Sequence, residues 1–145
     1  MKRSQEIEQF MHDLVAALER GDTAFMERTT SRAPGVVSIG SDPDEYARDY
    51  ERIMSLFNES TPQGPLHIHV RLNEVHGYEQ GDVGWADGTG SFERNGESVE
   101  TRFTAVLLRE AGEWRAVQSH ASIGVPNDHI FDRVFRSPHA TPQQP

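Results

Sequence analysis

Three side chains that could move protons or bind anions fall in successive segments of the C-terminal half: Asp87, Arg102 and His120. Each segment alternates apolar and polar residues, which is the period of a half-buried β-strand. The pKa of a free histidine is about 6.5, so His120 could act as a general acid or base at neutral pH. Arg102 could hold a carboxylate or stabilise developing negative charge. These residue types favour acid–base chemistry or the binding of a polar or anionic molecule.

The alternation also predicts which side chains share a face with this set. If that face is concave on all three strands, it forms a pocket wall that contains an Asp87–Arg102 pair. The predicted ligand-binding residues are Trp85, Arg102, Thr104 and Gln118 on these strands, together with Tyr46 from the preceding segment. His120 and Asp87 are the catalytic candidates if the protein is an enzyme. Two simpler interpretations stay open: a solvent-exposed Asp87–Arg102 pair that stabilises little, and a structural His120 near the end of the sheet.

Two histidines, His67 and His69, lie two residues apart on a predicted strand and would point the same way. A metal site would need at least a third ligand, and a solvated polar face explains the spacing equally well. Asp42, Asp44 and Glu45 lack the regular spacing and central glycine of a calcium loop, so helix capping is the better interpretation. We therefore expect no metal and no cofactor.

Three helices are predicted upstream of these strands. Residues 4–21 carry an apolar stripe at helical spacing, with an acidic first turn and a terminal glycine. Asp22 begins a second, shorter helix. After a short β-branched strand at residues 36–39, Asp42 is predicted to cap a third helix with Pro43 in its first turn. The stripe of this third helix is Tyr46, Tyr50, Ile53, Met54 and Phe57.

Four longer strands follow the third helix. They are predicted at residues 66–73, 83–92, 101–108 and 114–122, joined by short turns. Three glycines in the second strand, Gly84, Gly88 and Gly90, indicate sharp curvature of the sheet. The order helix, helix, strand, helix and four strands gives an α+β fold, with a curved antiparallel sheet wrapped around the N-terminal helices as a cone. We expect one domain over residues 1–136 and a mobile tail over residues 137–145.

The composition favours a soluble globular protein. The 145-residue chain is 35% hydrophobic and 26% charged, and its 23 acidic and 14 basic side chains give a net charge of −9. This excess of acid opposes nucleic-acid binding, because phosphates need a basic surface. The chain contains no cysteine, no apolar run of the roughly 20 residues that span a bilayer, and no apolar signal-peptide core. We expect a cytoplasmic protein that binds neither nucleic acid nor membrane.

The order of elements and two motifs resemble a known family. Residues 40–46 (Gly-Ser-Asp-Pro-Asp-Glu-Tyr) and residues 112–122 (Gly-x-Trp … His-x-Ser) are similar to the SnoaL-like branch of the nuclear transport factor two-like superfamily. The resemblance covers about residues 4–126. Thr101-Arg102 is also similar to a motif in the association domain of calcium/calmodulin-dependent kinases, where the arginine lies inside the cone.

This resemblance implies a cone-shaped fold that is usually dimeric through the outer face of its sheet. It does not fix one activity, since isomerases, dehydratases, cyclases, hydrolases and pure binding modules share the fold. We expect a SnoaL-like protein that binds a small polar or anionic molecule in the cone. The alternatives are a cofactor-independent isomerase, dehydratase or cyclase using His120 and Asp87, and a dimerisation module with an incidental pocket. The outer face predicted for a homodimer consists of Phe103, Ala105, Leu107, Val117, Ser119 and Ala121.

Overall fold

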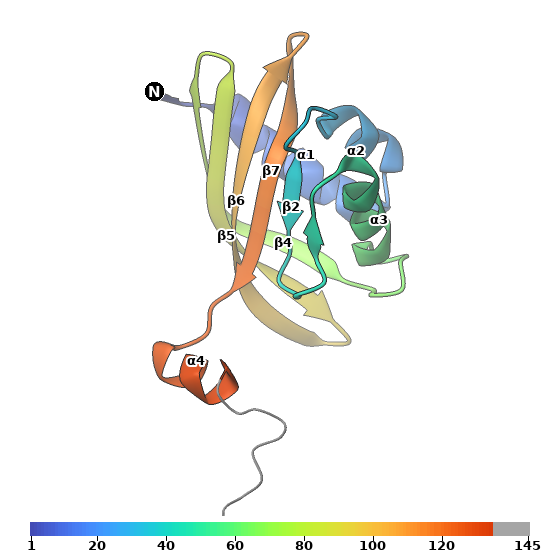
Figure 1. Ribbon diagram of the computed structural model, residues 1–145, viewed down its shortest axis with the longest axis vertical. Coiled ribbons are helices and arrows are strands. Elements are labelled where there is room, and N and C mark those ends of the chain that lie inside the picture. The colour runs from blue at the N-terminus through green and yellow to red at the C-terminus, as the bar shows by residue number, and fades with distance from the viewer. Residues whose placement is uncertain (135–145) are drawn as a thin grey trace, which may run out of the picture.

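A computed structural model describes residues 1–134 of the protein (Figure 1). Its elements are β1 (Lys2–Arg3), α1 (Gln5–Arg20), α2 (Thr23–Thr29), β2 (Val37–Ile39), β3 (Tyr46–Ala47), α3 (Tyr50–Ser60), β4 (His69–Gln80), β5 (Val83–Arg94), β6 (Glu97–Glu110), β7 (Glu113–Ile123) and α4 (Asn127–Val134). The tail predicted at residues 137–145 lies outside the described residues. Within residues 1–134, no helix has the length and apolar character needed to cross a bilayer.

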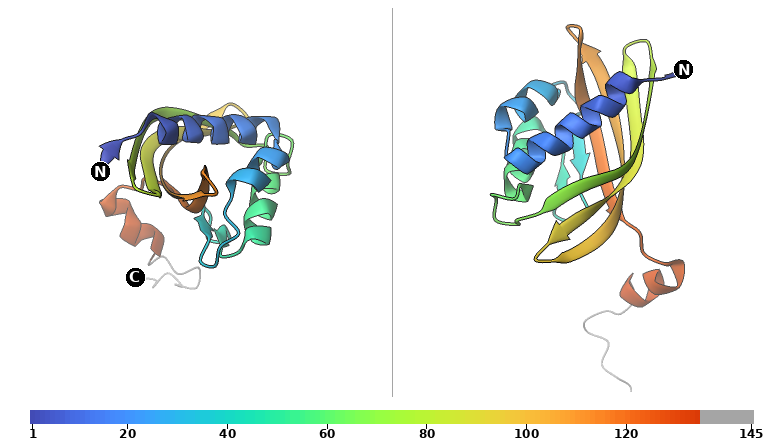
Figure 2. Two further views of the ribbon diagram at one scale, coloured as in Figure 1. Left: turned by 90° about the horizontal axis from the view of Figure 1, so that it is seen from above. Right: turned by 180° about the vertical axis from the view of Figure 1, so that it is seen from behind.

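One curved sheet, with helices on its concave side, makes up the fold. The strand order is β1-β4-β5-β6-β7-β2-β3, and every pairing is antiparallel except that of β2 with β7. Figure 2 shows α1 crossing the concave side of the sheet, with α2 and α3 beside it. The predicted α+β fold is confirmed, with a mixed rather than a wholly antiparallel sheet. β1, β3 and α4 are additions to the predicted order of elements.

α1 forms where the sequence predicts a helix, and its apolar stripe packs on the sheet. The Ser4 side chain accepts a hydrogen bond from Ile7 N at 3.4 Å, and Gly21 ends the helix with a φ of 65°. Ile7 is fully buried in one core cluster with Leu107 and Trp114. Because this core holds the first half of α1 on the sheet, the second half extends over the rest of the concave face.

The third helix begins later than predicted. Asp42 does not cap it: Asp42 and Glu45 close a turn in which Glu45 N donates to the Asp42 carbonyl oxygen at 3.0 Å. Asp49 is the N-cap instead, and its carboxylate accepts from Arg52 N at 2.8 Å. The chain between the two aspartates pairs with β2 as β3. Tyr46 therefore lies on an edge strand, 53% exposed, rather than in the apolar stripe of a helix.

A glycine in β5 allows the close strand packing of the curved sheet. At Gly88, an added Cβ would overlap the carbonyl oxygen of Glu74 and the ring of Phe103. The pairing of β4 with β5 is irregular at the same place, between Leu72 and Glu74. A larger side chain at position 88 would push β4 and β6 away from β5, so the curvature here depends on glycine.

A bulge in β7 changes the alternation of its side chains. Val106 pairs with Gln118, but its neighbour Leu107 pairs with Ala116, which leaves Val117 without a partner on β6. Side chains before and after this extra residue therefore follow different parities. A sequence count that assumes unbroken alternation assigns the second half of β7 to the wrong face.

The register places the predicted pocket wall on the outer, convex face of the sheet. Trp114 lies in the core beneath α1, whereas His120 is exposed, although alternation predicts one face for both. On β6, Leu107 is fully buried on the concave side, and Arg102 is exposed on the other side. The condition on which the predicted pocket wall depends, a concave face on all three strands, is therefore not met. The residues predicted to form the outer face (Phe103, Ala105, Leu107, Val117, Ser119 and Ala121) instead pack in the core or line the concave side.

Candidate functional site

Four predicted site residues meet in a shallow depression on the outer face of the sheet. Asp87, Arg102, Thr104 and His120 line it, and all four are exposed. Arg102 Nε donates to Ser122 Oγ at 3.1 Å, and within the described residues no ion pair joins Arg102 to Asp87. The sequence therefore brings these side chains together as predicted, but on the side opposite the helices. Their ligand-binding and acid–base roles stay predictions.

The other three predicted residues lie elsewhere. Trp85 is on the outer face, where its ring stacks on Tyr78 with the centroids 6.0 Å apart. Gln118 is exposed on β7, opposite Val106, and it lines a cavity on the concave side. Tyr46 is on the edge strand β3. None of the three lines the depression that contains Arg102.

The concave side holds a cavity of about 280 Å³ between the helices and the sheet. Its wall is largely apolar and includes Leu14, Leu18, Leu56, Phe57, Phe103 and Val117. The sequence signal for this cavity is the length of the α1 stripe. Ile7, Phe10 and Met11 are buried in the core, and the turns after them supply Leu14 and Leu18 to the cavity wall. The sequence predicts a pocket in the cone, but it assigns none of the α1 stripe to the pocket wall.

The uncharged polar side chains of the described lining are hydroxyls, apart from the amide of Gln118. Ser119 Oγ lies 2.8 Å from Ser38 Oγ, where β7 pairs with β2 in parallel. Thr30 and Thr101 also line the cavity, with exposed fractions of 3% and 8%. These hydroxyls offer hydrogen bonds but no charge to a bound molecule.

The ionisable side chains of the described lining are Glu45, Arg71 and His120. Arg71 Nε lies 2.9 Å from each Glu93 carboxylate oxygen, and the Arg71 side chain is 68% exposed. Glu45 Oε2 accepts from Asp42 N at 3.0 Å. His120 contributes to the strand that forms the wall, but its exposed side chain follows the outer face. The described lining therefore offers no acid–base pair to a molecule inside the cavity.

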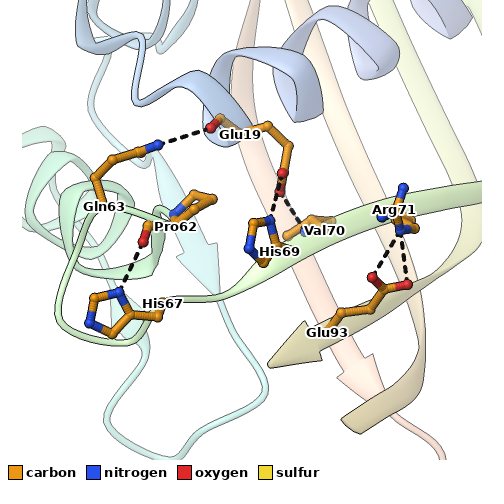
Figure 3. Close-up of polar contacts among 8 residues, drawn as sticks. All are labelled: Glu19, Pro62, Gln63, His67, His69, Val70, Arg71 and Glu93. Carbon is orange, nitrogen blue, oxygen red and sulfur yellow. Dashed lines mark hydrogen bonds and ion pairs between the residues drawn. The ribbon is translucent and has the colours of Figure 1, made fainter. Parts of the chain in front are cut away.

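Glu19, in the last turn of α1, joins that helix to the loop and strand that complete the cavity wall (Figure 3). Its Oε1 accepts from Val70 N at 2.7 Å, and its Oε2 lies 2.9 Å from His69 Nδ1. The Glu19 carbonyl oxygen accepts from Gln63 Nε2 at 3.4 Å. Because Val70 and Ile68 both line the cavity, these contacts fix the position of one wall.

The two histidines considered as metal ligands have separate partners. His67 Nδ1 lies 3.0 Å from the Pro62 carbonyl oxygen, and His69 Nδ1 faces Glu19 (Figure 3). His67 has a φ of 50° and precedes β4, so strand alternation does not apply to it. Among residues 1–134, no group of three or more histidine, cysteine, aspartate or glutamate side chains is arranged to hold a metal ion.

Solved structures of low sequence identity share this fold. An NTF2-like protein of unknown function from Pseudomonas putida KT2440 is 14% identical, with a TM-score of 0.71 over 85% of this chain and 87% of that one. A nuclear transport factor 2 (NTF2-like) superfamily protein from Salmonella enterica serovar Typhimurium is 17% identical, with a TM-score of 0.70 over 85% and 92% of the two chains. The association domain of CaMKII from C. elegans is 16% identical, with a TM-score of 0.63 over 81% and 93%.

Comparison of the sequence with family models identifies the family, whereas the structural comparisons show only the fold. Comparison with curated proteins found no match. The family model described as a SnoaL-like domain matches residues 7–126, which is more than half of the chain. These residues contain the core, the cavity and the outer depression, and they include both motifs on which the predicted resemblance depends. The chain therefore belongs to the SnoaL-like domain family, and it shares its fold with the NTF2-like structures.

Proposed function

We propose that this protein binds a small, mostly apolar molecule in the cavity between α1, α3 and the sheet. The observation that carries this proposal is the lining: about 280 Å³ of space is bounded mainly by apolar side chains, and two of its three ionisable side chains, Arg71 and His120, are exposed. The volume of this cavity is near the lower end of the roughly 300 to 1,000 Å³ that is usual for small-molecule sites, and such sites are mostly apolar.

The proposed ligand differs from the polar or anionic molecule that the sequence predicts. That prediction depends on Arg102, whose exposed side chain lies on the outer face and contacts Ser122. A carboxylate taken into the apolar cavity would lose its hydration without gaining a cationic partner. The cavity therefore favours uncharged compounds over anions.

The same geometry supports binding rather than catalysis. General acid–base catalysis needs a titratable side chain within hydrogen-bond reach of the reacting atoms. The catalytic candidates His120 and Asp87 lie together in the outer depression, where their side chains are exposed to water. An isomerase, dehydratase or cyclase using them would work outside the cavity and without exclusion of solvent. Binding needs no titratable side chain inside the cavity, so the cavity supports a binding function better than acid–base catalysis.

A fluorescence titration with N-phenyl-1-naphthylamine, a neutral apolar probe, tests this proposal. We expect saturable binding to the wild-type protein. Ala121→Phe adds a ring to the cavity wall, and we expect it to remove most of the binding. Ser122→Phe adds the same ring one residue later, on the outer face, and serves as the matched control that keeps the binding. A wild-type protein that shows no saturable binding would contradict the proposal, as would equal loss in both variants while both stay folded.

A second candidate function is homodimerisation through the outer face, which an apolar patch supports. Val83 is 41% exposed there, and Trp85, Val106 and Leu108 are half-buried on the same face. Helices α1, α2 and α3 lie on the opposite side of the sheet (Figure 2), so none of them covers this patch. An apolar sheet face suits a two-fold contact with a second copy of the chain.

A further inference from the structure

The chemistry of the cavity wall limits the charge of its ligand. The polar groups of the lining include the hydroxyls of Thr30, Ser38, Thr101 and Ser119, none of which ionises at neutral pH. Among the ionisable side chains of the described lining, Arg71 contacts Glu93, Glu45 accepts a backbone hydrogen bond, and the exposed side chain of His120 follows the outer face. A charged ligand group that enters among the apolar side chains would therefore lose hydration without gaining a counter-ion, which is unfavourable. A neutral ligand avoids this penalty.

Two of these hydroxyls form a pair on the cavity wall. The parallel register of β2 and β7 places Ser38 beside Ser119, and their Oγ atoms are 2.8 Å apart. Ser119 is also opposite Ala105, which is buried in the core, so the pair lies on the concave side. Both serines are half-buried and line the cavity. Strand pairing on both sides holds them in place before any ligand binds.

The hydrogen-bonding capacity of this pair is only partly used. Each hydroxyl has one donor hydrogen and two acceptor lone pairs. Whichever serine donates to the other, the accepting serine keeps its own hydrogen, and acceptor positions remain on both oxygens. The pair can therefore donate to a carbonyl oxygen, or both donate to and accept from a hydroxyl. A hydrocarbon would leave this capacity unused inside an apolar cavity.

We infer that the cavity takes an uncharged molecule with an apolar ring or chain and one hydroxyl or carbonyl oxygen, and that the Ser38–Ser119 pair holds this oxygen. The inference rests on the proposed function, because it names the class of molecule that the same cavity binds. It assigns to the two serines the polar contact that orients the ligand, while the surrounding aliphatic and aromatic side chains supply the apolar contact area.

Competition against bound N-phenyl-1-naphthylamine with three compounds of one skeleton tests the inference. The compounds are naphthalene, 2-naphthol and 2-naphthoate, which differ in carrying no polar group, a neutral hydroxyl or a charged carboxylate. For the wild-type protein we expect 2-naphthol to displace the probe at a concentration about two- to tenfold lower than naphthalene, the gain from one net hydrogen bond. We expect 2-naphthoate to be the weakest competitor because its charge has no partner in the cavity.

The double variant Ser38→Ala/Ser119→Ala assigns that preference to the pair. Removing both partners together leaves neither hydroxyl unpaired, so the variant should remain folded. We expect its affinity for naphthalene to stay within about twofold of wild type, and the preference for 2-naphthol to disappear. Ser122→Ala, which removes a hydroxyl from the outer face, is the matched control and should keep the wild-type preference.

The outcomes separate this inference from the proposed function. If the probe and naphthalene bind, but 2-naphthol gains nothing in wild type or keeps its advantage in the double variant, the inference is overturned and the proposed function stands. If 2-naphthoate competes best, the neutral ligand class is overturned. If neither the probe nor naphthalene binds the wild-type protein, the proposed function fails and the inference fails with it.

Discussion

Glu19 Oε1 accepts a hydrogen bond from the backbone N–H of Val70 at 2.7 Å, which joins the end of α1 to the start of β4. Leu18, the neighbour of Glu19, lines the cavity together with Val70. The bond therefore connects two walls of the cavity that are far apart in sequence. Its geometry makes Glu19 a structural support for the binding site rather than a group that contacts the ligand.

Replacement of Glu19 should lower stability through this bond. Glu19→Ala leaves the partly buried N–H of Val70 without its acceptor, and we expect the free energy of unfolding to fall by about 1 kcal/mol. Glu19→Gln keeps one acceptor oxygen and should lose less. Urea denaturation followed by tryptophan fluorescence measures both variants. Equal losses in the two variants would show that the acceptor oxygen does not carry the effect.

Stability at acidic pH should depend on Glu79. The Ser4 hydroxyl, 2.6 Å away, donates a hydrogen bond that holds the pKa of the Glu79 carboxyl below its ordinary value, and the Lys2 ammonium at 2.9 Å lowers this pKa further. A lowered pKa in the folded state means that the unfolded state binds the proton more readily. The stabilisation is therefore complete above the ordinary pKa and is lost as the pH falls through the lowered one.

The corresponding experiment compares the pH dependence of wild type with that of Glu79→Gln. We expect the wild-type free energy of unfolding to decrease between about pH 5 and pH 3, and Glu79→Gln to show a flatter decrease. Denaturant unfolding across this pH range measures both slopes. Identical slopes would mean that the interactions of Glu79 with Ser4 and Lys2 do not favour the ionised carboxylate in solution.

Local patterns were sufficient to predict much of the fold. The apolar stripe of α1 and its terminal Gly21 specify a helix through interactions between near neighbours in sequence. Asn95-Gly96 joins β5 to β6 with φ angles of 51° and 80°, the backbone geometry for which these residues are suited. Such features are predictable because each depends on a few consecutive residues.

Which residues of β7 face the cavity was not predictable from local patterns, because one extra residue in the strand reverses the alternation after it. The bulge at Val117 is marked by no glycine or proline in β7, and it arises from the pairing of Leu107 with Ala116 across strands. The choice between two capping aspartates, Asp42 and Asp49, likewise depends on the pairing of β3 with β2. Pairing between distant strands decides both the bulge and the choice of capping residue. Counting alternate residues along a single strand gives no information about that pairing.

Two adjacent leucines test the assignment of faces without any ligand. Leu107 is fully buried in the core beneath α1, whereas Leu108 is half-buried on the outer face opposite Val83. We expect Leu107→Ala to lower the free energy of unfolding by about 2 to 5 kcal/mol. Leu108→Ala should lower it by less than half as much, since it removes fewer buried contacts. Urea denaturation of both variants checks this order, and the reverse order would contradict the register of β6.

The apolar patch on the outer face predicts that the protein forms a homodimer. Val106 lies within this patch, paired with Trp85 on one side and Gln118 on the other. We expect the wild-type protein to be dimeric at micromolar concentration by size-exclusion chromatography with light scattering. Val106→Lys would bury a charge in the contact, and we expect it to be monomeric with an unchanged circular dichroism spectrum. His12→Lys adds the same side chain at an exposed position of α1 and should stay dimeric. A monomeric wild-type protein would leave the patch a solvated surface, whereas a dimeric Val106→Lys would place the interface on another part of the molecule.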